Sequence, residues 1–154
     1  MKKHIYYFVS NWSITAPLEH AADTIADYRH WTTWWRGLES ATVLHAEPSV
    51  GAQVACIWKS ATGYRLHSTV TITAYRHNQY IAFDSTGDLV GSGEWHFEPI
   101  DDSHSGMRIV WNVHSEKWWM NAFAWLLRPL FVKNHDLLMA AGERGLNDFL
   151  QNKQ

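Results

Sequence analysis

The chain has 154 residues, with 15 acidic side chains against 13 lysines and arginines and a formal net charge of -2 at pH 7. Its length suits one domain with a sizeable core, and its scattered basic residues exclude the positive stripe that nucleic acid binding requires. The single cysteine, Cys56, excludes an intramolecular disulfide and is expected to be a small core residue in a reducing compartment.

The first predicted elements are a strand and two helices. Over residues 5–14, large side chains alternate between two faces with the period of a strand. Pro17 opens a helix in the segment APLEHAADTIADY, and HWTTWWRG predicts a single helical turn that ends at Gly37. Neither the apolar run near the start nor the apolar window 118–132 is long enough for a signal peptide or a bilayer span. A cytoplasmic protein is therefore expected.

Six more short strands are expected after these helices. They cover residues 41–46, 52–58, 64–75, 80–85, 89–97 and 107–114. Because their connections are of hairpin length, we expect a strongly curved antiparallel sheet of seven strands. The order of elements indicates an α+β fold with the helices on one face of the sheet. The sequence has no linker or internal repeat, so residues 1–154 are expected to form a single domain.

Residues 118–150 predict a short aromatic helix followed by a long one, with Pro129 in the first turn of the second. The long helix gathers Phe131, Leu138, Gly142, Gly145 and Phe149 on one side and places Lys133, Asp136, Glu143, Arg144 and Asn147 mostly opposite. A glycine inside a helix costs roughly 1 kcal/mol relative to alanine, so these glycines indicate that a sheet or a ligand approaches the backbone closely. Asn134 and His135 flank this side, either as satisfied polar residues or as the lining of a pocket.

The alternation of side chains predicts which strand residues face inward. The inward rows are Val54, Cys56 and Trp58; Tyr64, Leu66, Ser68, Val70, Ile72 and Ala74; Ile81, Phe83 and Ser85; Leu89, Gly91, Gly93, Trp95 and Phe97; and Met107, Ile109, Trp111 and Val113. The glycines and serines among them are small for a core otherwise built from large aromatic residues. They indicate a cavity between the sheet and the long helix, with a sharp strand bend as the alternative explanation of the glycines.

Several motifs, taken in order, resemble a known family. They are ITAPLEH, YRLHSTVTIT, GDLVGSGEWHFEP, MRIVWNVHSEKWW and NHDLLMAAGERGLNDFL. The chain resembles the START-like superfamily in its polyketide cyclase/dehydrase (SRPBCC) branch. This resemblance implies a helix-grip fold, in which a seven-stranded antiparallel sheet wraps a long C-terminal helix around a hydrophobic cavity. Members of the superfamily bind lipids, sterols, plant hormones, polyketides or quinones, and some catalyse cyclisation or dehydration.

The resulting hypothesis is a protein that binds a small hydrophobic or aromatic molecule of lipid, polyketide or quinone type. We expect Trp58, Trp95, Trp111 and Leu138 to form apolar walls, Gly91 and Gly93 to leave room, and Ser68, Ser85, Asn134 and His135 to orient the polar end of the ligand. No cofactor is expected, because the sequence has no glycine-rich phosphate loop ahead of a helix. No metal site is expected either, because the histidines show no close ligand spacing.

Two other functions remain open at this point. One is a polyketide cyclase/dehydratase type of enzyme that uses the same cavity. The family has no single catalytic signature, so no catalytic residue is assigned, and His135 is the best candidate for an acid or base. The other is a lipid carrier that docks on membranes through a tryptophan-rich rim, with ordinary core packing as the alternative role of these residues. That rim would comprise Trp31, Trp34, Trp35, Trp118, Trp119 and Trp125.

Overall fold

The computed structural model describes residues 4–45 and 50–152, and within them an antiparallel sheet of seven strands. The strands are β1 (Ile5–Ile14), β2 (Leu38–His45), β3 (Gln53–Lys59), β4 (Arg65–Arg76), β5 (Tyr80–Gly87), β6 (Leu89–Asp101) and β7 (His104–Ser115). All seven predicted strands are confirmed, although β2 begins at Leu38 rather than at Ala41, and its predicted end at Ala46 lies outside the described residues.

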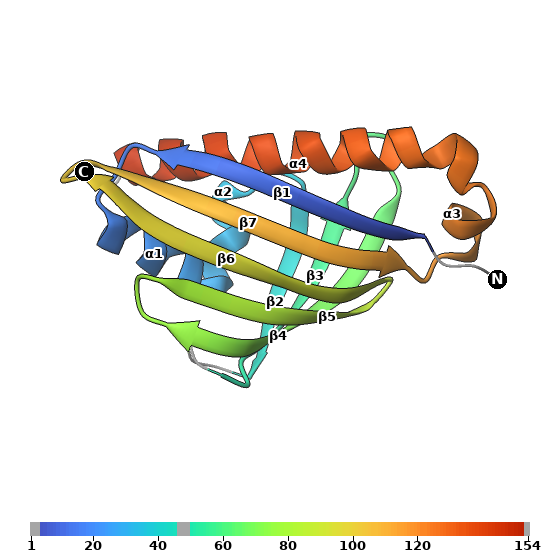
Figure 1. Ribbon diagram of the computed structural model, residues 1–154, viewed down its shortest axis with the longest axis horizontal. Helices are drawn as coiled ribbons and strands as arrows, with labels where there is room; N and C mark the ends of the chain where they lie inside the picture. The colour runs from blue at the N-terminus through green and yellow to red at the C-terminus, as the bar shows by residue number, and fades with distance from the viewer. Residues whose placement is uncertain (1–3, 46–49, 153–154) are drawn as a thin grey trace.

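The strand order is β1-β7-β6-β5-β4-β3-β2, so the first strand pairs with the last and successive hairpins build the remainder. Figure 1 shows the sheet curling from β1 and β7 in front, through β5 and β4 below, to β3 and β2 behind. The long C-terminal helix lies along the top of this curved sheet. The arrangement confirms the expected helix-grip fold.

The inward rows of the strands are buried as predicted, except that Tyr64 and Gly91 are half-buried and the alternation fails at the end of β4. The pairing of β4 with β5 shifts register between Ile72 and Ala74. Such an irregularity interrupts the alternation of inward and outward side chains along the strand. Beyond it, Tyr75 pairs with Ile81 and packs against the core, whereas Ala74 pairs with Ala82. The prediction that Ala74 belongs to the inward row was therefore wrong.

The helices after β1 are α1 (Leu18–Ala26), a 3-10 turn (Tyr28–His30) and α2 (Trp31–Trp34). Their tryptophans pack inward: Trp31, Trp34 and Trp35 are all buried. The Trp35 ring lies edge-on to Trp12 of β1 and to Trp58 of β3, with centroid distances of 5.4 and 5.2 Å. Edge-to-face pairs of this kind add to the stability that burial itself provides. These three tryptophans are thus part of the packed core.

The C-terminal third forms α3 (Trp118–Ala122) and α4 (Ala124–Asn152), and the break between them falls at Phe123. Pro129 therefore lies within α4 and not in its first turn, which corrects the prediction. Proline removes the N–H that would bond to the carbonyl of Trp125, four residues earlier. Within the described part of the chain, no helix is both long and apolar enough to cross a bilayer.

The buried side of α4 is broader than the predicted one, since it also includes Met139, Leu146 and Leu150. Glu143 and Asn147, which were predicted to lie opposite the buried side, contact β1 and the residue that follows it. Glu143 accepts a hydrogen bond of 2.8 Å from the Ser13 N–H, and Asn147 accepts one of 2.7 Å from the Thr15 N–H. Because β1 is an edge strand, these side chains satisfy backbone groups that no neighbouring strand reaches.

The helix glycines are explained by packing within the protein. A Cβ atom at Gly142 would lie 2.6 Å from the Trp12 ring, and one at Gly145 would lie 1.8 Å from the Trp34 carbonyl oxygen. Trp34 belongs to α2, so Gly145 lets two helices approach almost backbone to backbone. The close neighbour inferred from the sequence is therefore an indole ring and another helix rather than a ligand.

Candidate ligand-binding cavity

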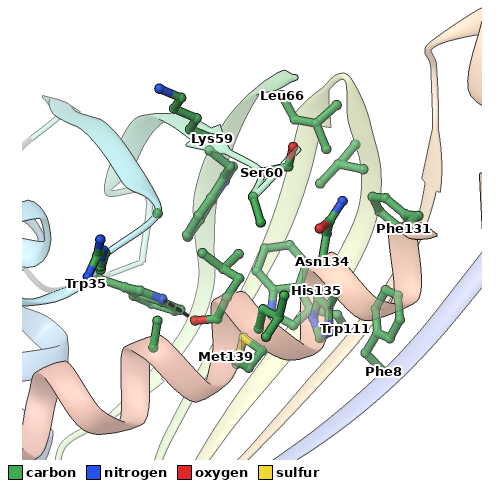
Figure 2. Close-up of a pocket in the computed structure, with 18 of the residues that line it drawn as sticks. Phe8, Trp35, Lys59, Ser60, Leu66, Trp111, Phe131, Asn134, His135 and Met139 are labelled. Atoms are coloured by element: carbon green, nitrogen blue, oxygen red, sulfur yellow. Dashed lines mark hydrogen bonds between the residues drawn. The ribbon is translucent and has the colours of Figure 1, made fainter. Parts of the chain in front are cut away.

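A cavity of about 570 Å³ is enclosed by α4 and the inner face of the sheet. This volume falls within the range of about 300–1,000 Å³ typical of small-molecule sites. The walls are mainly apolar, and include Phe8, Leu66, Leu89, Val113, Phe131 and Met139. In Figure 2, Leu66 and Ser60 face Asn134, His135 and Met139 of α4 across this space.

The cavity opens between three segments. These are the link from α2 to β2, with Arg36 and Gly37, the turn from β3 to β4, with Lys59 to Ala61, and one side of α4, with Leu137 and Arg144. Arg36, Lys59, Leu137 and Arg144 are exposed while still lining the cavity, so they mark its mouth. Gly37 has a φ of +103°, and a Cβ atom there would lie 2.6 Å from the end of the Leu138 side chain. Glycine thus lets this link pass close to α4.

His135 is the most enclosed ionisable residue of the cavity lining, with a side chain only 12% exposed. Its ring stacks on Phe8 at a centroid distance of 3.7 Å, and neither ring nitrogen has a hydrogen-bond partner among the described residues. The Asp136 carboxylate is 3.8 Å from Nδ1, which is beyond hydrogen-bonding distance. Burial lowers the pKa of His135 from 6.5 to about 4, so the imidazole is neutral at pH 7.

Asn134 joins α4 to the turn between β3 and β4. Its Nδ2 donates hydrogen bonds to the Tyr64 hydroxyl at 3.1 Å and to the Thr62 hydroxyl at 3.3 Å. Burial also raises the pKa of Tyr64 above its ordinary value, so its hydroxyl stays protonated at neutral pH. Asn134 therefore has its donors committed, whereas its amide oxygen has no such bond within the described residues and can accept one.

The indole groups of the cavity wall differ in their hydrogen bonding. Trp58 Nε1 donates to the Ser68 hydroxyl at 3.0 Å, and Trp35 Nε1 donates to the Leu138 carbonyl at 3.0 Å. Trp111 Nε1 is buried and has no partner among the described residues. Trp58 and Trp35 are thus held in place by the protein, while Trp111 retains an unused donor.

The sequence-predicted site divides into two groups. Trp58, Trp111, Asn134, His135 and Leu138 line the cavity, whereas Ser68, Ser85, Gly91, Gly93 and Trp95 do not. Ser68 and Ser85 lie behind the wall, where Ser68 accepts the bond from Trp58 and Ser85 donates to the Leu89 carbonyl at 2.8 Å. Trp95 lies in the aromatic core, 5.5 Å from the ring of Trp12.

The expectation that Gly91 and Gly93 leave room for a ligand was wrong. A Cβ atom at Gly93 would lie 2.3 Å from the Phe83 ring, and one at Gly91 would lie 2.0 Å from the Asn112 carbonyl oxygen. Gly91 has a φ of +156°, in an extended conformation at the margin of the region that side chains avoid. The volume that these glycines leave is filled by Phe83 and by the backbone of β7.

Sequence reasoning missed several residues of the cavity. Phe8 and Phe131 had a usable signal, since Phe8 shares its strand face with Trp12 and Phe131 lies on the predicted buried side of the helix. The three cations of the mouth had none, because Arg36, Lys59 and Arg144 come from segments far apart in the chain. Their proximity depends on how the loops and α4 meet.

The described residues contain no group of three or more histidine, cysteine, aspartate or glutamate side chains that could hold a metal ion. Histidines instead pair with single carboxylates, as His96 does with Glu94 at 2.9 Å. Burial raises the pKa of Cys56 to about 12, so its thiol is protonated and packs as a small core residue, as predicted.

The sequence matches the protein family described as polyketide cyclase / dehydrase and lipid transport over residues 8–146. None of the curated proteins compared with the chain matches it. Among solved structures, the Zhui aromatase/cyclase from Streptomyces sp. R1128 has a TM-score of 0.78 at 15% identity, covering 97% of this chain and 96% of that one.

Two further structures share the architecture. A START superfamily protein from Mycobacterium smegmatis has a TM-score of 0.76 at 12% identity, with 96% of this chain and 99% of that chain covered. Norcoclaurine synthase from Thalictrum flavum, solved with dopamine and hydroxybenzaldehyde, has a TM-score of 0.67 at 9% identity, with 99% and 90% covered. At these identities, the likeness shows a common fold.

Proposed function

The chain belongs to the polyketide cyclase / dehydrase and lipid transport family, and we propose that it binds a small hydrophobic or aromatic molecule, of lipid, polyketide or quinone type, between its sheet and α4. The observation that carries the proposal is the apolar cavity of about 570 Å³, whose lining includes polar groups that the protein itself does not satisfy. Such a combination of apolar walls and few polar groups is typical of ligand sites.

Trp58, Trp111 and Leu138 supply apolar walls in this proposal, together with Phe8 and Phe131. The polar end of the ligand lies near Asn134 and His135. The amide oxygen of Asn134 accepts a hydrogen bond from it. Both His135 nitrogens are buried and have no partner within the described protein, so the ligand bonds to one of them only when the ring turns towards the cavity. Because the imidazole is neutral, it can donate through one nitrogen and accept through the other.

The residues behind the wall support the site without contacting the ligand. Ser68 orients the Trp58 indole through the hydrogen bond of 3.0 Å, and Ser85 holds the start of β6 through the Leu89 carbonyl. Trp95 and the two strand glycines keep the aromatic core closed beneath the cavity. Changes at these positions therefore affect binding only through the stability or shape of the wall.

A direct test is native mass spectrometry of the freshly purified protein, followed by a titration with the fluorescent probe 1-anilinonaphthalene-8-sulfonate. Ala141→Trp narrows the cavity, since Ala141 lines it from α4. We expect this variant to bind the probe at least about tenfold more weakly, which corresponds to about 1.4 kcal/mol. Ala82→Trp, on the outer face of β5, is the matched control and should bind like the wild type. Equal binding by all three proteins would place the probe outside the cavity and contradict the proposal.

Catalytic turnover is a second candidate, and His135 is the observation that favours it. A neutral, enclosed imidazole can take up a proton from a bound substrate, although a pKa of about 4 makes it a weak base at neutral pH. Incubation of any co-purifying compound with the protein, followed by mass spectrometry, tests this function. Conversion by the wild type and not by His135→Leu would support an enzyme. An unchanged compound would instead indicate binding without catalysis.

A further inference from the structure

Large apolar side chains are exposed together where α3 meets α4. Trp118 is 66% exposed and Trp125 is 79% exposed, and the exposed Phe123 and Leu126 lie in the same short stretch. We refer to these four residues as the aromatic corner. Figure 1 shows α3 and the start of α4 together at the end of the molecule where β1 begins. Single exposed hydrophobic residues are ordinary, but a group of this kind marks an interaction surface.

The aromatic corner continues along α4 towards the mouth of the cavity. Leu126, Leu130, Lys133 and Leu137 are spaced by three or four residues and so lie on one side of the helix. Leu130 and Leu137 are exposed, and Leu137 also lines the cavity. This side of α4, which we refer to as the apolar stripe, therefore connects the exposed tryptophans to the opening of the ligand site.

Most of the charged residues around this surface are cations. Between residues 117 and 135 the charged side chains are Lys117, Arg128 and Lys133, with no acid, although the whole chain carries -2. Lys117 has an acidic neighbour, Asp88, at 3.5 Å. Arg128 lies over the Tyr6 ring at 4.5 Å, and it donates a hydrogen bond of 3.2 Å to the backbone carbonyl of Ile5 rather than to a carboxylate.

The mouth of the cavity adds further positive charge. Arg36, Lys59 and Arg144 line it, and none of them has an ion pair with a described residue. Figure 2 shows the Lys59 ammonium group turned outward from the cavity. The acid next to the stripe is Asp136, which is turned by about 100° around the helix from Leu137. The exposed apolar surface is therefore bordered mainly by cations.

We propose that the aromatic corner and the apolar stripe dock on a lipid bilayer that carries anionic headgroups, with the mouth of the cavity towards the bilayer. Tryptophan suits the boundary between headgroups and acyl chains, and lysine and arginine are attracted to anionic lipids. This assigns a surface that ligand binding alone does not require. It also corrects the expected rim: Trp31, Trp34 and Trp35 are buried and Trp119 packs against the core, so these four take no part, whereas Trp118 and Trp125 do.

Vesicle flotation tests the apolar contribution. The full chain is mixed with vesicles of phosphatidylcholine alone or of phosphatidylcholine with a minor share of phosphatidylglycerol. We expect flotation with the anionic vesicles, and a loss of partitioning of about tenfold or more when Trp118→Ser and Trp125→Ser are combined. Leu44→Ser with Ile100→Ser removes two comparably exposed apolar residues outside the surface and should leave flotation unchanged. If the double tryptophan variant fails to fold, Trp125→Ser alone replaces it.

A charge reversal tests the electrostatic contribution. Lys133→Glu should weaken flotation with anionic vesicles by roughly tenfold or more, while Arg29→Glu, which changes the net charge equally from an exposed position outside the surface, should not. The proposal is overturned if the wild type floats with neither vesicle, or if both reversals have the same effect. It is also overturned if light scattering without lipid shows a dimer that the tryptophan substitutions dissociate, because the surface then joins two copies of the chain.

Discussion

The imidazole of His135 lies against the ring of Phe8, with centroids 3.7 Å apart and planes inclined by 11°. This stacking places an ionisable side chain of α4 directly on an aromatic residue of β1, at the boundary between the core and the cavity. The contact covers one face of the imidazole and removes water from it. Desolvation is accordingly the main cause of its lowered pKa.

The lowered pKa of His135 predicts a loss of stability in acid. The folded protein holds the group neutral down to about pH 4, whereas in the unfolded chain it takes up a proton near its ordinary pKa of 6.5. The stability that the protein gains by holding His135 neutral is therefore fully present above pH 6.5. It is lost as the pH falls towards 4, which lowers the free energy of unfolding by up to about 3 kcal/mol.

Urea unfolding at about pH 7 and about pH 4.5 measures this effect. In His135→Leu, the difference in unfolding free energy between the two pH values should shrink by about 2–3 kcal/mol relative to the wild type. His20→Leu, on the exposed side of α1, is the matched control. An identical pH dependence in the His135 variant and the wild type would show that the buried imidazole is not responsible.

Gly93 is predicted to be required for folding rather than for ligand entry. An alanine Cβ atom there would lie 2.3 Å from the Phe83 ring and 2.7 Å from the Val110 carbonyl oxygen. Gly93→Ala should lower the free energy of unfolding by about 1–3 kcal/mol, as overpacking of a core does, and Gly93→Leu by more. Chemical denaturation provides the measurement.

Two further variants make the Gly93 prediction specific. Adding Phe83→Leu to Gly93→Ala should restore part of the stability, because the ring contact is relieved while the carbonyl contact remains. Gly106→Ala is the matched control, since its Cβ atom would have no neighbour closer than 3.4 Å. Equal losses at both glycines would indicate a general cost of replacing glycine in these strands, not a clash with Phe83.

Gly145 is predicted to set the distance between α4 and α2. A Cβ atom would lie 1.8 Å from the Trp34 carbonyl oxygen, so Gly145→Ala forces the two helices apart. Although alanine favours the helix by roughly 1 kcal/mol, we expect a net loss of about 1–3 kcal/mol in unfolding free energy. Thermal and chemical unfolding measure it. Ala140→Gly, the reverse change on the same helix, should cost only about 1 kcal/mol. A more stable Gly145→Ala protein would contradict the close approach.

The sequence was most informative where structure is local. Alternation along each strand predicted the inward rows, because successive side chains of a strand must point to opposite faces. It failed at Ala74, where an irregularity in the pairing with β5 shifts the register. Pro129 was also misplaced: proline is typical of the first turn of a helix, but α4 begins at Ala124 and extends through it.

The strands, the long helix and the family resemblance could all be predicted from the sequence by itself, since periodicity and motif order are properties of the chain. Only the tertiary structure decided where the cavity lies. A glycine removes a side chain but does not determine what occupies the space, and at Gly93 the occupant is Phe83. The cavity opens instead where the α2–β2 link, the β3–β4 turn and α4 meet, because its volume depends on the distances between segments that are remote in the chain.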